Sequence, residues 1–329
     1  MAEAYRPDTL QGYIGQENLK KNIGTLLDAA KRDKRTVDHC LFYGISGGGK
    51  TTIARILHSE MKSVFPGSRL HSTIAPAIQS VGDLVQILLR IKEGDVLFID
   101  EAHSLTLKSG ECLYTAMEDR RVDVTIGNEV VRTLTIPLPD FTVVGATTRL
   151  SKMTQPLRDR FSGGVFRVEY YTPEQLTDIL KLSASKFGVS VTAEGLEILS
   201  NRGRGTPRVA LNLLKWATST AKALDWGIDK DIALAACDAI GVDNLGLVQD
   251  HRDYLEALIK RGGVAGLASM CRMLNREEGD VSLIETDLVR FGLMEYGDEG
   301  RKITALGHSH MTPYMPVKVK KSRKLSEVR

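Results

Sequence analysis

The sequence predicts an α/β domain with a parallel sheet, then an all-helical segment, then a C-terminal winged helix. The α/β prediction rests on five short apolar runs separated mostly by helical stretches, an arrangement typical of parallel strands covered on both faces. The second part rests on a change of pattern at Thr172-Pro173, after which the chain has helical periodicity to about Gly241. The third rests on three helical runs and a terminal hairpin within residues 242–312.

The strands of the predicted sheet are runs of apolar and β-branched residues bounded by polar or turn-forming residues. A helix precedes them at 17–32, where Leu19 and Ile23 fall on one face. Between the third and fourth strands, two alternating segments in 122–136 flank a Gly-Asn-Glu turn, which predicts a β-hairpin that projects from the core. The expected strands are His39–Tyr43, Arg69–Ala75, Asp95–Asp100, Phe141–Thr147 and Val165–Tyr171.

The helical segment and the winged helix are inferred from helix caps and periodicity. One helix starts near Pro207 and is expected to bury Trp216, and Trp226 is expected in the same core. In the third part we expect helices at His251–Arg261, Gly266–Leu274 and Ser282–Phe291 and strands at Leu293–Tyr296 and Arg301–Thr304. The expected domains are therefore 1–171, 172–241 and 242–312, followed by a basic, disordered tail at 313–329.

The composition indicates a soluble, globular protein of the cytoplasm. Apolar residues make up 42% and charged residues 26% of the 329 residues, and no apolar stretch approaches the length of a membrane span. The N-terminal residues have no signal-peptide character. Four scattered cysteines without metal-ligand spacing indicate reduced thiols. A formal net charge of +3 does not by itself indicate a polyanionic partner.

A phosphate-binding loop is predicted at residues 44–51 (Gly-Ile-Ser-Gly-Gly-Gly-Lys-Thr), which fit G-x-x-x-x-G-K-[ST] directly after the first expected strand. Its glycines let backbone N–H groups close around phosphates, and the following helix adds its positive N-terminal end. An accidental Gly-rich turn is the alternative, which the strand before and the helix after argue against. The expected nucleotide-binding residues of this loop are Gly47, Gly49, Lys50, Thr51 and Thr52.

Two adjacent carboxylates end the third expected strand. At the end of a buried parallel strand, Asp100 is expected to hold Mg²⁺ opposite Thr51, and Glu101 to polarise the attacking water. A solvated acidic turn is the alternative, and the phosphate-binding loop upstream favours the catalytic interpretation.

Further polar residues follow the fourth expected strand. Thr148 stands where ligands bind in open α/β sheets, so its hydroxyl is expected near the γ-phosphate or the water, although a strand-ending turn has the same pattern. Arg158 and Arg160 come soon after, and a guanidinium suits the charge of a transferring phosphoryl group. A surface Arg–Asp network is the alternative for these arginines.

These blocks occur in the order found in AAA+ ATPases, and they resemble most closely the RuvB family, the bacterial Holliday-junction branch-migration motors. The resemblance covers roughly residues 5–310. The blocks that carry it are Arg6-Pro7, Tyr13-Ile14-Gly15-Gln16, Gly94–Glu101, Tyr114–Asp119, Gly145–Arg149, Pro156–Phe161, Tyr171–Glu174 and Arg204–Arg208.

The resemblance implies an ATP and Mg²⁺ site with assigned roles. Lys50 and Thr51 are the Walker A residues, Asp100 and Glu101 are Walker B, and Thr148 is sensor 1. By the same resemblance Arg160 is the finger that acts on an adjacent protomer, and Arg208 is sensor 2. The adenine side of the implied pocket is formed by Tyr13 and Ile14, with Tyr171 among the nucleotide-binding residues.

The resemblance also implies partners. The family assembles as homo-hexamers around duplex DNA and acts on Holliday junctions, with no membrane involved. The hairpin 122–136 would dock a RuvA-like junction-binding protein, and the winged helix would face DNA, with Arg301 and Lys302 as expected contacts. Lid motions driven by ATP turnover would then pull the duplex.

Several positions depart from the family pattern. Ile45-Ser46 stand where a Pro-Pro pair is common, and Gly48 stands where Leu is common. The expected wing tip around Asp298-Glu299 is acidic where the family's tip is basic, which weakens the expected grip on phosphates. An ATP-gated loader or assembly factor, acting on a DNA-bound protein partner, is therefore kept as the alternative to a DNA motor.

Asp100-Glu101-Ala102-His103 also spells the signature of DEAH-box helicases. We interpret this as a coincidence, because the single-core layout and the blocks after the fourth strand belong to another architecture. His103 is accordingly expected to be a structural or supporting residue rather than a metal ligand.

Overall fold

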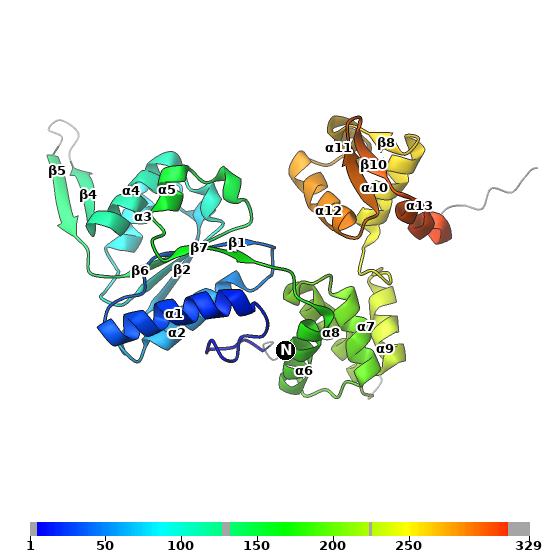
Figure 1. The fold of residues 1–329 in the computed structure, drawn as a ribbon, viewed down its shortest axis with the longest axis horizontal. Helices are drawn as coiled ribbons and strands as arrows, with labels where there is room; N and C mark the ends of the chain where they lie inside the picture. The colour runs from blue at the N-terminus through cyan, green and yellow to red at the C-terminus, as the bar shows by residue number, and fades with distance from the viewer. Residues whose placement is uncertain (1–4, 127–131, 224–225, 315–329) are drawn as a thin grey trace, which may run out of the picture. The chain divides into compact units, whose positions relative to one another are not determined.

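A five-stranded parallel sheet organises the first of two units into which the chain divides, Met1–Cys237 and Asp238–Arg329 (Figure 1). The structure, a computed structural model, describes residues 5–126, 132–223 and 226–314. The strand order is β2-β3-β6-β1-β7, and all four neighbouring pairs are parallel, which confirms the predicted sheet. The strands are β1 (Cys40–Gly44), β2 (Leu70–Ile74), β3 (Val96–Asp100), β6 (Thr142–Thr147) and β7 (Gly164–Val168).

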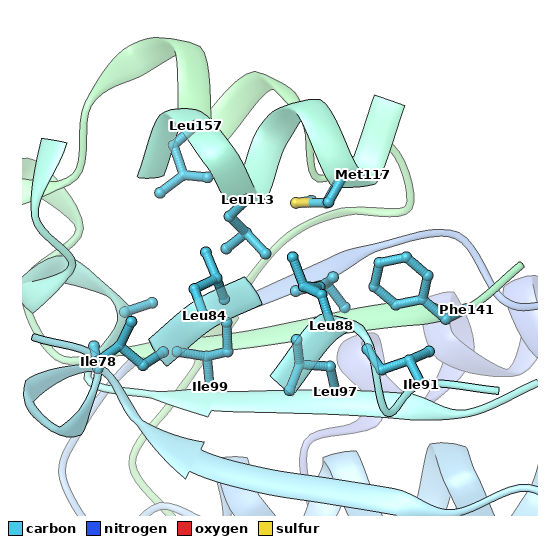
Figure 2. Packing of buried hydrophobic residues seen from close by; sticks show 14 of the residues in the cluster. Ile78, Leu84, Leu88, Ile91, Leu97, Ile99, Leu113, Met117, Phe141 and Leu157 are labelled. Carbon is cyan, nitrogen blue, oxygen red and sulfur yellow. The ribbon is translucent and has the colours of Figure 1, made fainter. Parts of the chain in front are cut away.

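The sheet packs against a core on each of its two faces. Successive side chains of a strand point to opposite faces, so one strand contributes to both cores. On β3, Leu97 and Ile99 belong to one core cluster and Phe98 to the other. Figure 2 shows Leu84, Leu88, Leu113 and Met117 packed above the first of these faces. Helices α1 (Glu17–Asp33) and α2 (Lys50–Met61) cover the second face, and α3 (Val81–Leu88), α4 (Leu107–Asp119) and α5 (Gln155–Asp159) cover the first (Figure 1).

The predicted hairpin is a separate antiparallel pair, β4 (Arg121–Ile126) and β5 (Arg132–Pro137), which follows α4 directly. Its turn, at 127–131, lies outside the described residues. Val122 at the base is buried in the core below α4, whereas Leu134 is 50% exposed. The hairpin therefore presents an apolar side chain to solvent while its base is fixed to the α/β core.

The segment after the sheet is helical, as predicted, apart from an isolated parallel bridge between Val191 and Ile228. Two of its helices start with side-chain caps: Thr172 and Gln175 form a capping box, and the Thr192 hydroxyl accepts from the Gly195 N–H. The helices are α6 (Pro173–Phe187), α7 (Ala193–Arg202), α8 (Pro207–Ala223) and α9 (Lys230–Ala239).

Three expectations for this region are corrected. Trp216 and Trp226 are 53% and 66% exposed rather than in the core, because Leu213, Leu214 and Ala217 form the buried face of α8. The last strand of the sheet ends at Val168, so the predicted Val165–Tyr171 is too long. The Tyr171 N–H instead donates to the Gly205 carbonyl, at 2.9 Å, where the chain has left the sheet.

The second unit is a winged helix, as predicted, with a three-stranded sheet of order β8-β10-β9. Three of its elements were not predicted: β8 is only two residues long, and α13 and the turn η4 follow the wing where no further element was expected. The expected tail 313–329 therefore begins within a 3-10 turn, and residues 315–329 lie outside the described residues. The elements are α10 (Gln249–Lys260), β8 (Val264–Ala265), α11 (Leu267–Leu274), α12 (Glu278–Arg290), β9 (Met294–Gly297), β10 (Gly300–Ile303), α13 (Ala305–Met311) and the 3-10 turn η4 (Thr312–Tyr314).

A buried carboxylate, Glu285 on α12, joins four elements of this unit. It is 1% exposed and accepts hydrogen bonds from Tyr254 of α10 at 2.8 Å and from Tyr296 of β9 at 2.9 Å. Arg301 of β10 donates to both of its oxygens, at 2.8 and 3.3 Å. Burial first, and then the bond to Glu285, raises the pKa of Tyr254 and of Tyr296, so both phenols stay protonated donors.

Arg301, expected as a contact to duplex DNA, is engaged within its own unit. Its guanidinium is held by Glu285 and lies over the Tyr296 ring, 5.4 Å from the centroid. The hydrogen bonds to Glu285 raise the pKa of Arg301 further, which fixes its charge. Lys302 points outward instead, with a side chain that is 57% exposed and 3.5 Å from Glu295.

Replacing Arg301 by Met should destabilise the winged helix strongly, because it leaves Glu285 buried without its cation. A loss of about 3–5 kcal/mol is expected for such a broken buried pair. Hydrogen exchange of α12 amides in the full chain would measure it, with Lys302→Met as the matched control, expected to change stability by less than about 0.5 kcal/mol. Equal protection in the two variants would contradict the structural role of Arg301.

Candidate nucleotide-binding site

The phosphate-binding loop connects β1 to α2 and is closed by glycine conformations. Gly47 and Gly49 have φ of 73° and 101°, in the left-handed region that favours glycine. A Cβ at Gly47 would lie 2.6 Å from the Cβ of Arg208, and one at Gly49 would lie 2.7 Å from the Tyr13 hydroxyl. Glycine is thus required at both positions by backbone angle and by close approach.

Lys50 is the first residue of α2 and is buried, with 7% exposure. Its ammonium donates to the carbonyls of Gly44 and Ile45, at 3.0 and 2.7 Å, so the charge is satisfied within the loop. Burial lowers the pKa of Lys50, and the nearby carboxylates of Asp100 and Glu101 oppose that shift. The Lys50 ammonium is therefore held by the backbone of the loop beside the cavity in which a phosphate would lie.

Polar groups from three adjacent strands meet at the carboxyl end of the sheet, since β3, β6 and β1 are neighbours. Asp100 ends β3, and its Oδ1 accepts the Glu101 N–H at 2.9 Å. The Thr148 hydroxyl, just after β6, donates to Glu101 Oε2 at 3.3 Å. The two acids and the threonine thus converge beside the loop that follows β1.

These groups line one cavity of about 490 Å³ in the first unit. The predicted residues Tyr13, Ile14, Thr51, Thr52 and Tyr171 line it as well. Sequence reasoning missed several of its walls, although helical spacing places Arg55 four residues after Thr51 and Lys215 seven after Arg208. The lining residues that were not predicted are Tyr5, Arg6, Pro7, Ser46, Arg55, Ile179, Pro207, Leu211, Asn212 and Lys215.

A buried tyrosine pair connects this cavity to the loop. The hydroxyls of Tyr13 and Tyr171 lie 3.0 Å apart, and both bond the Gly48 carbonyl, at 3.4 and 3.1 Å. Burial, reinforced by Tyr171, raises the pKa of Tyr13 well above its usual value, and burial also raises the pKa of Tyr171. Both phenols remain neutral. They bind the loop to the segment before α1, through Tyr13, and to the residue just before the helical segment, through Tyr171.

Arg208, at the start of α8, is packed on the phosphate-binding loop. Its backbone N–H donates to the Gly47 carbonyl at 3.4 Å, and its Nη1 donates to the Ser46 hydroxyl at 3.3 Å. The side chain lines the cavity with the loop residues. A nucleotide in the cavity would therefore contact the helical segment and the loop together.

Arg160, by contrast, is not among the residues that line the cavity. Its Nε lies 2.7 Å from Glu118 Oε2, and its guanidinium lies 5.7 Å from the centroid of the Tyr114 ring. Tyr114 and Glu118 are one turn apart on α4, so one face of that helix holds the arginine. Arg160 thus pairs with Glu118 of α4 and not with its sequence neighbour Asp159, which the alternative of a surface Arg–Asp network had suggested.

The parallel sheet with its phosphate-binding loop, acidic strand end and helical lid defines an AAA+ P-loop ATPase. Residues 5–167 match the family model described as the Holliday junction DNA helicase RuvB P-loop domain. Residues 171–243 match the RuvB AAA lid domain, and 244–312 match the RuvB C-terminal winged helix domain. The chain belongs to the RuvB family.

Named relatives resemble this chain over nearly its whole length. It is 41% identical to the Holliday junction branch migration complex subunit RuvB of Campylobacter fetus, over 97% of this chain and 93% of that protein. The corresponding subunit of Sulfurimonas denitrificans is 40% identical over 94% and 92%. The solved structure of the Thermotoga maritima RuvB Holliday junction branch migration motor is 34% identical, covers 94% of this chain and 99% of that one, and superposes with a TM-score of 0.83.

Two departures from the family pattern offset each other in the loop. A Cβ at Gly48 would lie 2.6 Å from Ile45 Cγ1 and 2.9 Å from Val168 Cγ1, so the Ile45 side chain fills the space that a side chain at 48 would need. The glycine and the isoleucine are thus complementary.

Gly48→Ala alone should therefore weaken nucleotide binding, because overpacking of this kind costs about 1–3 kcal/mol. Adding Ile45→Ala should recover part of the lost affinity, because it removes the contacts with Ile45 and leaves only the one with Val168 Cγ1. Titration of a fluorescent ADP derivative against the two single variants and the double variant checks this. A double variant that binds no better than Gly48→Ala would rule out the compensation.

Proposed function

We propose that this chain is an ATP-driven motor that translocates duplex DNA and drives branch migration at Holliday junctions. The names of its relatives, a Holliday junction branch migration complex subunit and a branch migration motor, support the proposal. The observation that carries the proposal is the single cavity lined by Lys50, Glu101, Thr148 and Arg208. These residues come from the loop, two strand ends and the lid, so one nucleotide would contact the edge of the sheet and the lid together. We also propose the domain division at 171/172 and 241/242 given above.

The chemistry assigned to the site is hydrolysis of ATP. Thr51 and Asp100 both line the cavity and offer a hydroxyl and a carboxylate oxygen, the hard donors that Mg²⁺ prefers. When bound, the ion would neutralise charge on the phosphate oxygens. Glu101 would accept a proton from the attacking water, while Lys50, Thr148 and Arg208 stabilise the phosphate oxygens.

Arg160 is assigned to a neighbouring subunit's site, in a homo-hexameric ring. Its position outside the cavity of its own chain supports action in trans. The hairpin 122–136, with Leu134 exposed on β5, is proposed to dock a RuvA-like junction-binding partner. We place the activity in the cytoplasm. No helix in the described part of the chain is long and apolar enough to cross a membrane.

The winged helix supplies the reason to keep a second candidate. Residues 244–312 contain 11 Asp and Glu against 8 Lys and Arg, and Arg301 is engaged by Glu285. Because phosphate contacts dominate affinity for duplex DNA, this unit would contribute little non-specific grip. That balance favours an ATP-gated loader acting on a DNA-bound protein partner as the alternative function.

The two candidates differ in how DNA affects turnover. For a motor, we expect the steady-state ATPase rate to rise strongly with long duplex DNA and the stimulation to fall as salt is added, because phosphate contacts are screened. Glu101→Gln, the matched blank, should still bind ATP while losing about 10²- to 10⁴-fold in rate. A slow rate that DNA leaves unchanged, in a preparation that forms rings with ATP, would instead favour the loader.

Arg160→Ala should bind nucleotide normally yet lose about 10³-fold or more in turnover, as expected for a finger. Lys50→Ala should bind no nucleotide but still present Arg160 to its neighbour. Mixing the two inactive variants should therefore restore activity, measured as ATPase rate against mixing ratio. A mixture that stays inactive, or an Arg160→Ala protein that turns over freely, would refute action in trans; Arg158→Ala serves as the control.

A further inference from the structure

His103 follows the acidic pair and has no role in the function proposed above. It lies in a 3-10 turn, η2 (Ala102–Ser104), between β3 and α4, and its side chain is 11% exposed. Its Nδ1 is 2.9 Å from the Thr147 hydroxyl and 3.3 Å from Glu101 Oε2. One ring nitrogen thus faces both the end of β6 and the proposed catalytic base.

The contacts of Thr147 and Glu101 decide which atom carries the proton. An unprotonated Nδ1 would set its lone pair against a carboxylate oxygen, which is repulsive, so the Nδ1–H tautomer is favoured. The Thr147 oxygen already accepts the Arg149 N–H, at 3.0 Å, and has a second lone pair for His103. The Nδ1–H therefore bonds Thr147 and lies next to Glu101 Oε2, the oxygen toward which a small rotation of the ring would turn it.

The ring itself is neutral in this setting. Burial lowers the pKa of His103, Arg149 and Lys152 lower it further, and Glu101 and Asp100 oppose them. A neutral ring with a fixed Nδ1–H holds a carboxylate without forming an ion pair that would reduce its basicity. His103 is suited to hold Glu101 while leaving it able to accept a proton.

Thr148, which also donates to Glu101, is expected to contact the nucleotide as well. Thr148 bonds the same Oε2 at 3.3 Å and also lines the cavity, where sensor 1 would contact the γ-phosphate or the water. When that hydroxyl turns to the nucleotide, Glu101 loses it as a partner. His103 is not among the cavity-lining residues, so its contact with Glu101, at 3.3 Å, does not compete with the nucleotide.

We propose that His103 is a positioning residue that holds the Glu101 carboxylate through its Nδ1–H and ties it to Thr147 at the end of β6. This inference rests on the proposed function, in which Glu101 is the base. His103 would keep that carboxylate oriented toward the cavity at the moment when Thr148 is engaged elsewhere.

Two variants, His103→Asn and His103→Gln, test the proposal, because they carry the same amide donor on side chains of different length. In His103→Asn the amide N–H lies about where Nδ1 lies, and in His103→Gln it lies one atom further out. His103→Leu removes the donor, and His308→Leu, at an exposed histidine, is the control. For each, kcat and KM for ATP hydrolysis are measured without DNA, alongside the affinity for a fluorescent ADP derivative and the thermal unfolding midpoint.

We expect His103→Leu and His103→Gln to lose roughly ten- to a hundredfold in kcat, part of the contribution that a positioned base makes. KM and the ADP affinity should change little. His103→Asn should recover most of the lost rate, and His308→Leu should match the unmodified chain. If Asn and Gln are equally active, or if the loss appears in KM or ADP affinity instead, the positioning role is wrong.

Glu101→Gln separates failure of this inference from failure of the proposed function. If Glu101→Gln is inactive while all His103 variants keep the full rate, only the role of His103 is refuted. If Glu101→Gln hydrolyses ATP at the full rate, the assignment of the base fails, and the inference about His103 fails with it.

Discussion

The nucleotide site depends on one constraint, the adjacency of β3, β6 and β1 in a parallel sheet. Parallel strands end at the same edge, so the residues that follow these three strands are brought together whatever their distance in sequence. Lys50, Glu101 and Thr148 come from three separate segments and still line one cavity. The two core clusters keep the strands in register, and the chemistry at the edge follows from that packing.

A second layer of contacts joins the loop to the parts that respond to it. The Gly48 carbonyl receives two tyrosine hydroxyls, and the Gly47 carbonyl receives the N–H of Arg208. Tyr171 lies between β7 and the helical segment, so hydrogen bonds of 3.1 to 3.4 Å join the loop to the residues that lead into the lid and to α8. The glycines at 47 and 49 make that close packing possible, since any side chain there would displace Arg208 or Tyr13.

The sequence was sufficient for the sheet, the loop and the acidic strand end, because local patterns define them: an apolar run, a glycine spacing and a carboxylate pair. Trp216 was misplaced because its size was given more weight than its position: Leu213, Leu214 and Ala217 define the buried face of α8 at helical spacing, and Trp216 lies outside that face. The pairing of Arg301 could not be predicted, because its partner, Glu285, is 16 residues away and the contact depends on tertiary packing. The walls of the cavity on α2 and α8 lay at helical spacing from predicted residues, so that signal was present but unused.

Glu285 gives the winged helix a mechanical property as well as a stable core. A wing whose two strands contact only each other would bend at its turn when it is pulled, and the helices would not move with it. Here both strands of the wing are fastened through one buried carboxylate to α10 and α12. A force applied at the tip would therefore be transmitted to α10 and α12 with little deformation of the wing.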